Sequence, residues 1–400
     1  MPSQPVTKKP RQTLVKTALV IGLAAALLQI GRATADLVGL VQGHNAIDLR
    51  FYYRWTHEWF TGQNIYTLHE YLQGYPPASI LLLYPFTGWM SWEQSRWLWA
   101  TLNFASIAVI AFIAIRATHA KQWHERVFLL LLVLLANGTQ VTVTNGQASL
   151  YVLAQLLAAI LILHSYPPRW RTDLAAAVLF IGALLKPNLS LPFVWLLVIF
   201  PNSLRIRPLL LVGIGYFVLS LWAAEIVGKP LVELGLQFLG NRLAQTGISQ
   251  DPNLHFVLAR LGLEGLSLPV SAIIFATLGM WAWRFRRADI WLLLGVSAIV
   301  TRFWGFHWIY DNVLLIIPEI TLFGIWRQNE THQRNWALLL LGLNALAILP
   351  PGNFGGQAAF IQYSLLVFQT CVWLATLAYL IWYTRFQSDR DAQKYQPVQK

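Results

Sequence analysis

The sequence has little charge and a single cysteine. Only 12% of its 400 residues are Asp, Glu, Lys or Arg, whereas soluble domains average about a quarter. This cysteine, Cys371, lies inside an apolar segment. Because the chain has one cysteine, both a disulfide framework and a thiolate metal cluster are excluded. Glycine-rich phosphate loops, serine nucleophile elbows and His-Glu zinc motifs are also missing from any usable context, so nucleotide-dependent chemistry has no support.

Hydrophobic residues, by contrast, make up 56% of the chain. This composition predicts an all-α polytopic membrane protein whose helices cross the bilayer. The net charge of +12 then indicates membrane orientation rather than nucleic acid binding, because Lys and Arg collect beside spans on the cytoplasmic side. Apolar segments recur along the whole chain, at residues 17–30, 105–115, 127–136, 209–224, 336–349 and 365–382.

The basic clusters predict the topology. With residues 1–16 in the cytoplasm, the first span runs outward and residues 43–95 form an outer loop. Segment 78–90 within this loop reaches only roughly 20 Å, less than the roughly 30 Å of a hydrocarbon core, so we expect it to lie on the outer surface. The result is one membrane domain, 1–400, with about twelve spans in the cell membrane, both termini in the cytoplasm and a cytoplasmic tail at 385–400.

Residues 227–267 form a second outer loop, which also faces outward. Two other points of this topology stay open. Segments 174–185 and 189–200, on either side of Pro187, are short for spans and can equally be half-spans. The N-terminal segment also fits a cleaved signal peptide, whose removal would leave the first loop outside in any case.

Asp48 is the most informative polar residue, because it is the one aspartate of the first outer loop and stands just before a run of aromatic residues. It precedes an amphipathic stretch in which Phe51, Trp55 and Trp59 recur at four-residue spacing. This stretch predicts an interfacial helix anchored by aromatic side chains. Asp48 fits two roles about equally well, as the N-cap of that helix and as a catalytic carboxylate.

Other polar residues gather at the outer ends of spans. Each is also explained by simple contact with water and headgroups. Lys186 precedes Pro187, and short, proline-broken segments often line binding sites in membrane proteins, although a lysine extending to the interface explains it equally. His307 and Asp311 lie one helical turn apart, which predicts an ion pair or an oriented imidazole.

A metal site has weak support. His44 and Asp48 repeat the spacing of His307 and Asp311, but two such pairs without a third anchor do not define a cation site. We therefore expect no metal and no cofactor.

Several motifs, taken in their order, carry a resemblance. The chain resembles the polyprenyl-phosphate-mannose-dependent mannosyltransferases of glycosyltransferase family 87, in the multispan GT-C superfamily, over most of its length. The turn at 250–254 reads Gln-Asp-Pro-Asn-Leu in place of an Asn-Gln-Ser type sequence, which leaves the donor or the acceptor open. The matching features are Asp48, residues 62–66, Tyr75-Pro76-Pro77, Asn145-Gly146-Gln147, Leu185-Lys186-Pro187, the turn before Arg260, and residues 307–311.

The resemblance implies a GT-C-like bundle and an inverting hexosyltransferase on the outer face. It would transfer mannose, as the expected sugar, from a polyprenyl phosphate to a glycolipid or glycan of the cell envelope. It further implies Asp48 as general base, phosphate binding by Lys186, Arg260 and Arg302, assistance from His307, and sugar contacts from Tyr75 and Gln147. The alternative is a secondary transporter of twelve spans, which predicts two related halves that the sequence does not show.

Overall fold

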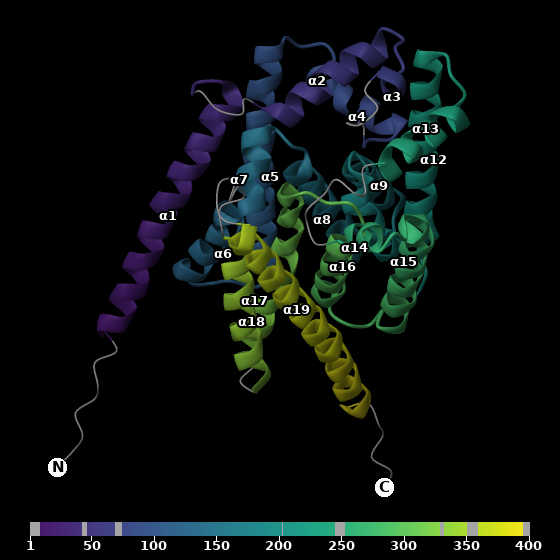
Figure 1. The fold of residues 1–400 in the computed structure, drawn as a ribbon. Coiled ribbons are helices and arrows are strands. Elements are labelled where there is room, and N and C mark those ends of the chain that lie inside the picture. Colours follow the sequence, from purple (N-terminus) through teal and green to yellow (C-terminus); the bar gives the residue numbers. More distant parts are fainter. Residues whose placement is uncertain are drawn as a thin grey trace, which may run out of the picture.

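The computed structural model describes residues 9–41, 46–68, 74–201, 203–244, 253–328, 332–349 and 359–394. In this part of the chain the regular structure is helical, and the β-structure is one isolated bridge between Ile199 and Leu204. The predicted all-α fold is confirmed. Figure 1 shows α2, α3 and α4 at one end of the bundle, while α1 begins and α19 finishes at the other.

The helices follow one another through short connections. Their bounds are α1 Lys9–Val38, α2 Ile47–Phe60, α3 Ile65–Leu68, α4 Pro77–Thr87, α5 Trp92–Ala117, α6 Trp123–Leu135, α7 Asn137–Asn145, α8 Ser149–Ser165, α9 Trp170–Ala183, α10 Pro187–Ser190, η1 Leu191–Val194, α11 Trp195–Val198, α12 Ile206–Val227, α13 Leu231–Ala244, α14 Leu254–Arg260, η2 Glu264–Leu266, α15 Ser267–Arg284, α16 Ile290–Trp304, η3 Ile309–Leu315, α17 Ile316–Gln328, α18 His332–Ile348 and α19 Ala359–Lys394.

Six of the described helices are long and apolar enough to cross a membrane, so this is a polytopic membrane protein. Helices α6 and α7, which meet at a bend of 51°, make a seventh crossing if they are counted as one span. The count of about twelve is not confirmed and stays a prediction. The six are Val15–Val38, Trp92–Ala117, Ile206–Val227, Glu264–Arg284, Ile309–Gln328 and Tyr363–Ser388.

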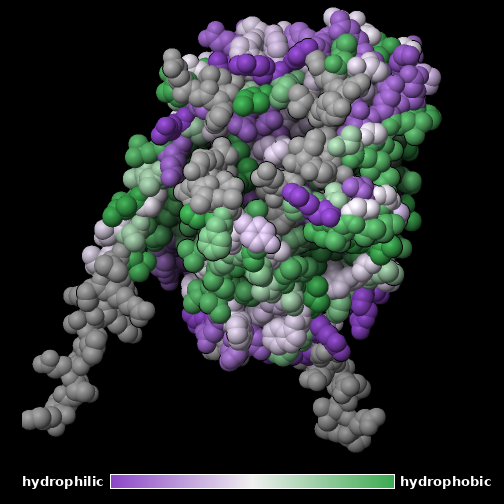
Figure 2. Space-filling view, in the orientation of Figure 1, coloured by the Kyte–Doolittle hydropathy of each residue, from purple (hydrophilic) through white to green (hydrophobic). Residues whose placement is uncertain are grey.

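The surface agrees with a lipid environment. Figure 2 shows hydrophobic residues across the middle of the visible face and hydrophilic residues toward both ends. Large apolar side chains such as Leu28, Phe217 and Met280 are exposed on α1, α12 and α15. Exposure of this kind stabilises a protein in a bilayer, whereas in water it would promote aggregation.

The predicted helix after Asp48 is present as α2. Its Tyr52, Trp55 and Trp59 face is buried against the bundle, and the Trp59 indole N–H donates to the Ala223 carbonyl at 3.0 Å. The aromatic face of α2, which we expected at the membrane interface, therefore packs on other helices of the protein. The predicted interfacial position of α2 is not confirmed.

The two arms around Pro187 differ from each other. The first forms α9, and the second is broken into α10, the 3₁₀ turn η1 and α11. The break follows from sequence, because Pro187 and Pro192 each remove a backbone donor and fix φ. Lys186 stands at this break and is buried.

Helix α7 makes two unusually close contacts, and both depend on glycine. A Cβ added to Gly138 would lie 2.6 Å from the backbone nitrogen of Val313 in η3. Gly146 follows α7 with φ of +67°, and an added Cβ would lie 2.5 Å from the Cβ of Leu49 in α2. The two glycines thus bring η3 and α2 to the same short helix, which sets the geometry of the site between them.

We expect Gly138→Ala to lower the stability by about 1–3 kcal/mol, because the added methyl group forces η3 away from α7. The measurement is the melting temperature of the detergent-purified protein. The control is Gly342→Ala in α18, where an added Cβ meets nothing within 4 Å and a small gain of up to about 1 kcal/mol is expected. Equal melting of the Gly138 variant and wild type would contradict the close-contact argument.

Candidate active site

A cavity of about 600 Å³ lies among α2, the segment just before α4, the α7–α8 turn, the break after α9, helix α13 and the segment that leads into η3. Its volume falls in the usual range for small-molecule sites. Its wall combines aromatic rings with a few charged and polar groups. It is lined by Ile47, Asp48, Phe51, Tyr52, Trp55, Gly74, Tyr75, Asn145, Gln147, Lys186, Asn188, Arg242, Phe306, Trp308, Tyr310 and Asp311.

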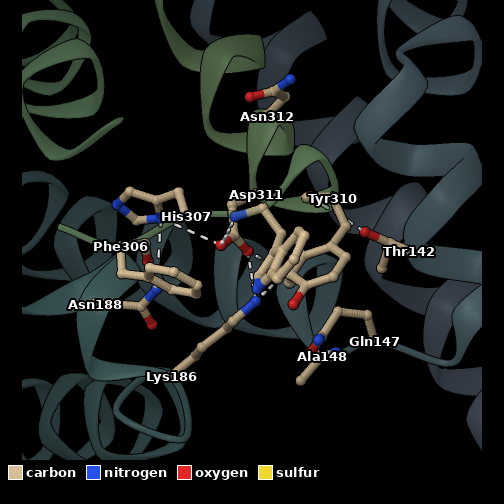
Figure 3. A network of polar contacts seen from close by, with 12 residues as sticks. Thr142, Gln147, Ala148, Lys186, Asn188, Phe306, His307, Tyr310, Asp311 and Asn312 are labelled. Atoms are coloured by element: carbon tan, nitrogen blue, oxygen red, sulfur yellow. Dashed lines mark hydrogen bonds and ion pairs between the residues drawn. The ribbon is translucent and has the colours of Figure 1, made fainter. Parts of the chain in front are cut away.

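A buried ion pair forms one side of the cavity. Lys186 Nζ lies 2.5 Å from Asp311 Oδ1, and it also donates to the Ser149 hydroxyl at 3.0 Å. The same ammonium group stands 4.2 Å from the centre of the Tyr310 ring. Figure 3 shows Lys186 extending toward the Asp311 carboxylate. The pair joins the break after α9 to the start of α8 and to η3.

His307 lies behind the ion pair rather than on the cavity wall. Its Nδ1 is 3.2 Å from Asp311 Oδ2, and its Nε2 is 2.7 Å from the Thr301 carbonyl oxygen. The side chain is fully buried. The contact between His307 and Asp311 that the four-residue spacing predicted is therefore present, and this geometry lets His307 orient Asp311.

Two of the predicted phosphate-binding arginines lie away from the cavity. Arg260 is exposed on α14, with its guanidinium over the ring of Phe256. Arg302 is buried on α16, where its Nε donates to Asn312 Oδ1 at 2.7 Å. Neither belongs to the cavity wall, so among the three predicted cations only Lys186 does.

Arg242 supplies a cation that the sequence reasoning missed. It projects into the cavity from α13, in the second predicted outer loop, and its guanidinium lies 5.0 Å from the centre of the Phe306 ring. One signal for Arg242 was present in the sequence, a basic residue far from the cytoplasmic clusters. Arg260 carries the same signal, so spacing alone could not choose between the two.

Asp48 lies in the first turn of α2, but the N-cap is Ala46, which makes no side-chain cap bond. The N-cap interpretation is therefore wrong. Asp48 Oδ2 is buried and has no hydrogen-bond partner among the described residues. Burial raises the pKa of Asp48 to about 6, against the opposing effects of Lys186 and of the Asn145 and Gln147 amides.

This pKa determines the charge of Asp48. Below about pH 6 the carboxyl group is protonated, and above it the group is an anion. A carboxylate with a raised pKa holds an accepted proton more firmly than an ordinary aspartate at neutral pH, which suits a general base. Asp311 differs, because Lys186 and His307 already occupy its oxygens.

Tyr75 and Gln147 both line the cavity, as their predicted sugar contacts require. Their polar groups also contact each other, since the Tyr75 hydroxyl donates to Gln147 Oε1 at 3.1 Å. The Tyr52 hydroxyl contacts the same oxygen and lies 2.6 Å from that of Tyr75. Tyr52 and Tyr310 were not predicted, because nothing in their local sequence separates them from packing aromatics.

Some predicted features cannot be placed. His44, residues 250–252 of the turn before Arg260, residues 1–8 and residues 395–400 lie outside the described residues. Within the described residues, no three His, Cys, Asp or Glu side chains are grouped so that they could hold a metal ion.

We expect Lys186→Met to lower the stability by about 3 kcal/mol, because it leaves a buried carboxylate without its partner. Lys186→Met combined with Asp311→Asn removes both charges and should recover part of this loss. The matched control is Lys229→Met, whose exposed pair with Glu233 has a distance of 3.3 Å and should contribute less than about 1 kcal/mol. Melting temperatures of the four proteins give the comparison, and equal losses for the two single variants would contradict it.

Comparison with known proteins identifies the family. The family model for glycosyltransferase family 87 matches residues 71–318. This range includes every cavity residue from Gly74 onward and begins after α2, so it does not include Asp48. No curated protein and no solved structure matches the chain. The chain belongs to glycosyltransferase family 87, and it is a membrane glycosyltransferase that acts on a sugar donor and an acceptor.

Proposed function

We propose that this enzyme transfers a hexose, with mannose as the expected sugar, from a polyprenyl phosphate to a glycolipid or glycan of the cell envelope. The reaction takes place on the outer face of the cell membrane. One observation carries the proposal: an unpaired carboxylate, Asp48, shares a cavity with two cationic side chains, Lys186 and Arg242.

In the proposed reaction Asp48 accepts the proton of the acceptor hydroxyl. The hydroxyl oxygen forms a bond to the anomeric carbon, while the bond from that carbon to the phosphate oxygen breaks. The sugar configuration inverts, and polyprenyl phosphate leaves. The raised pKa of Asp48 and its position on the cavity wall support this role, because the base must hold a proton and reach the reacting hydroxyl.

The leaving phosphate requires positive charge. Lys186 and Arg242 line the cavity and are suited to bind its oxygens by charge-assisted hydrogen bonds. His307 and Arg302 support this side indirectly, through Asp311 and Asn312. The aromatic side chains Trp55 and Trp308 on the cavity wall are suited to pack on a sugar ring.

The charge distribution and the arrangement of the helices support the outer location. The beginning of α1 and the last residues of α19 lie at the same end of the bundle, and α2 to α4 lie at the opposite end (Figure 1). With the basic clusters in the cytoplasm, the cavity beside α2 faces outward. About twelve crossings result if α8, α9, the α10–α11 segment, α16 and α18 complete the six long helices and the bent α6–α7 pair.

We expect Asp48→Asn to reduce sugar transfer about 10²- to 10⁴-fold, because the amide cannot accept the proton. The assay follows labelled mannose from polyprenyl-phosphate-mannose to acceptors in membranes, at matched protein levels. Glu58→Gln is the control, since this residue is on the same helix but pairs with Arg54 outside the cavity. Full activity of the Asp48 variant would exclude this residue as the base.

Arg242→Gln and Arg260→Gln test which arginine binds the donor. We expect the first to lower kcat/KM for the donor about 10- to 100-fold, since it removes a charge-assisted hydrogen bond to phosphate. Arg260→Gln carries the same change on an exposed helix outside the cavity and should retain most of the activity. Equal effects of the two substitutions would contradict the assignment of Arg242. The measurement is initial rate against donor concentration.

A further inference from the structure

Arg242 reaches the cavity from α13, and polar contacts join this helix to the first predicted outer loop. The Asn64 side-chain amide donates to Gln237 Oε1 at 2.8 Å. One turn further along α13, the Asn241 amide donates to the Tyr66 carbonyl oxygen at 3.2 Å. Residues four apart lie on one face of a helix, so these two bonds hold the rotation of α13. They thereby set the direction in which the neighbouring Arg242 side chain points.

The Arg242 guanidinium lies directly against Gly74 of the same predicted loop. A Cβ added to Gly74 would lie 2.4 Å from Arg242 Nη1, 3.1 Å from its Cζ and 3.3 Å from its Cδ. Atoms that are not bonded pack at about 3.5–4.0 Å. Because α13 is held in place, a methyl group here would move the flexible end of the arginine rather than the helix.

The cavity wall shows what this contact is for. Gly74, Arg242 and Phe306 all line the cavity, and the centre of the Phe306 ring is 5.0 Å from Arg242 Cζ. The guanidinium therefore has its place in the cavity because residue 74 has no side chain. A shorter cation would not have this requirement, since a lysine side chain ends where arginine has its Cζ and carries no Nη1.

We propose that Gly74 is a positioning residue, which holds open the space in which the Arg242 guanidinium meets the donor phosphate. The inference rests on the proposed function, in which Arg242 binds that phosphate. It adds a steric requirement in the first predicted outer loop to the charge that the second one supplies. Position 74 then determines whether an arginine on α13 can serve the reaction.

The test combines Gly74→Ala and Arg242→Lys, each alone and both together, in the full-length protein. With Arg242 present, Gly74→Ala should lower kcat/KM for polyprenyl-phosphate-mannose about tenfold, because a charge-assisted hydrogen bond to phosphate is lost. In the Arg242→Lys background the same change should cost less than about twofold, because the two substitutions act on one contact. A backbone or folding role of Gly74 predicts equal losses in both backgrounds.

A second measurement follows Arg242 independently of activity. Phenylglyoxal modifies accessible guanidinium groups, and mass spectrometry of the peptides gives the labelling rate of Arg242 relative to Arg260, which is exposed on α14. Gly74→Ala should raise this ratio several-fold, because the guanidinium leaves its place against residue 74. Gly240→Ala on α13 is the matched control, since an added Cβ there meets nothing within 4 Å. It should change neither the ratio nor the activity.

Folding of the variants is covered by the same set. Melting temperatures of the detergent-purified proteins show whether Gly74→Ala is folded. If it is not, the combined variant carries the test, because Arg242→Lys removes the atom that the methyl group would meet at 2.4 Å. Recovery of folding in the combined variant supports the inference, and failure to recover overturns it.

The outcomes separate this inference from the proposed function. Higher labelling of Arg242, together with a loss of activity confined to the arginine background, supports both. Higher labelling with unchanged activity supports positioning by Gly74 and shows that Arg242 does not bind the donor phosphate. An unchanged labelling ratio, or equal losses of activity in the two backgrounds, overturns the inference. If the wild type transfers no mannose from this donor, the labelling ratio alone decides.

Discussion

The site depends on the cost of keeping charge away from water. Lys186 and Asp311 are almost completely buried, and such a pair is stable only when short contacts and further hydrogen bonds offset the lost hydration. Ser149, Tyr310 and His307 provide those contacts. Ser149 begins α8, Tyr310 lies in η3, and His307 lies in the segment just before η3, so these parts of the chain must all come close to Lys186. The ion pair therefore explains why several irregular backbone segments converge at one level.

The same constraint explains where helices are broken. Backbone outside regular helix is tolerated at membrane depth only where it lines a cavity or is buried in protein. The break after α9, the turn after α7 and the segment before η3 all border the cavity. Gly138 and Gly146 allow η3 and α2 to approach α7 closely enough to close it. The cavity is thus a consequence of helix breaks that proline and glycine permit.

Sequence reasoning found the parts of the site that have a local signal. Asp48 is the one aspartate of the first outer loop, and Lys186 precedes a proline in a short apolar segment, so both could be predicted. Arg242 could not be separated from Arg260, because the choice depends on how α13 packs and not on spacing. The locations of Arg302 and His307 behind the cavity wall also depend on tertiary packing. Their partners, Asn312 and Asp311, lie close in sequence, yet the direction of each side chain follows from the turn at η3.

The fold, like the site, could be predicted where it depends on composition but not where it depends on how helices pack. Composition was sufficient for an all-α membrane protein, because every backbone polar group in lipid has to be satisfied within its own segment. The aromatic face of α2 was assigned to the membrane, and it packs on the bundle instead. Periodicity identifies a face that avoids water, but lipid and protein satisfy that face equally well.

The charges on the cavity wall fit the proposed reaction in a specific way. Asp48 and Asp311 are balanced by Lys186 and Arg242, so the wall has no net charge while Asp48 is ionised. When Asp48 accepts the acceptor proton, the wall gains one positive charge. At the same step the donor phosphate changes from a diester to a monoester and gains one negative charge. The two changes arise together within one cavity of low polarity, where their attraction is strongest. A paired Asp48 would lose this coupling, because the ion pair would hold it as an anion throughout the reaction.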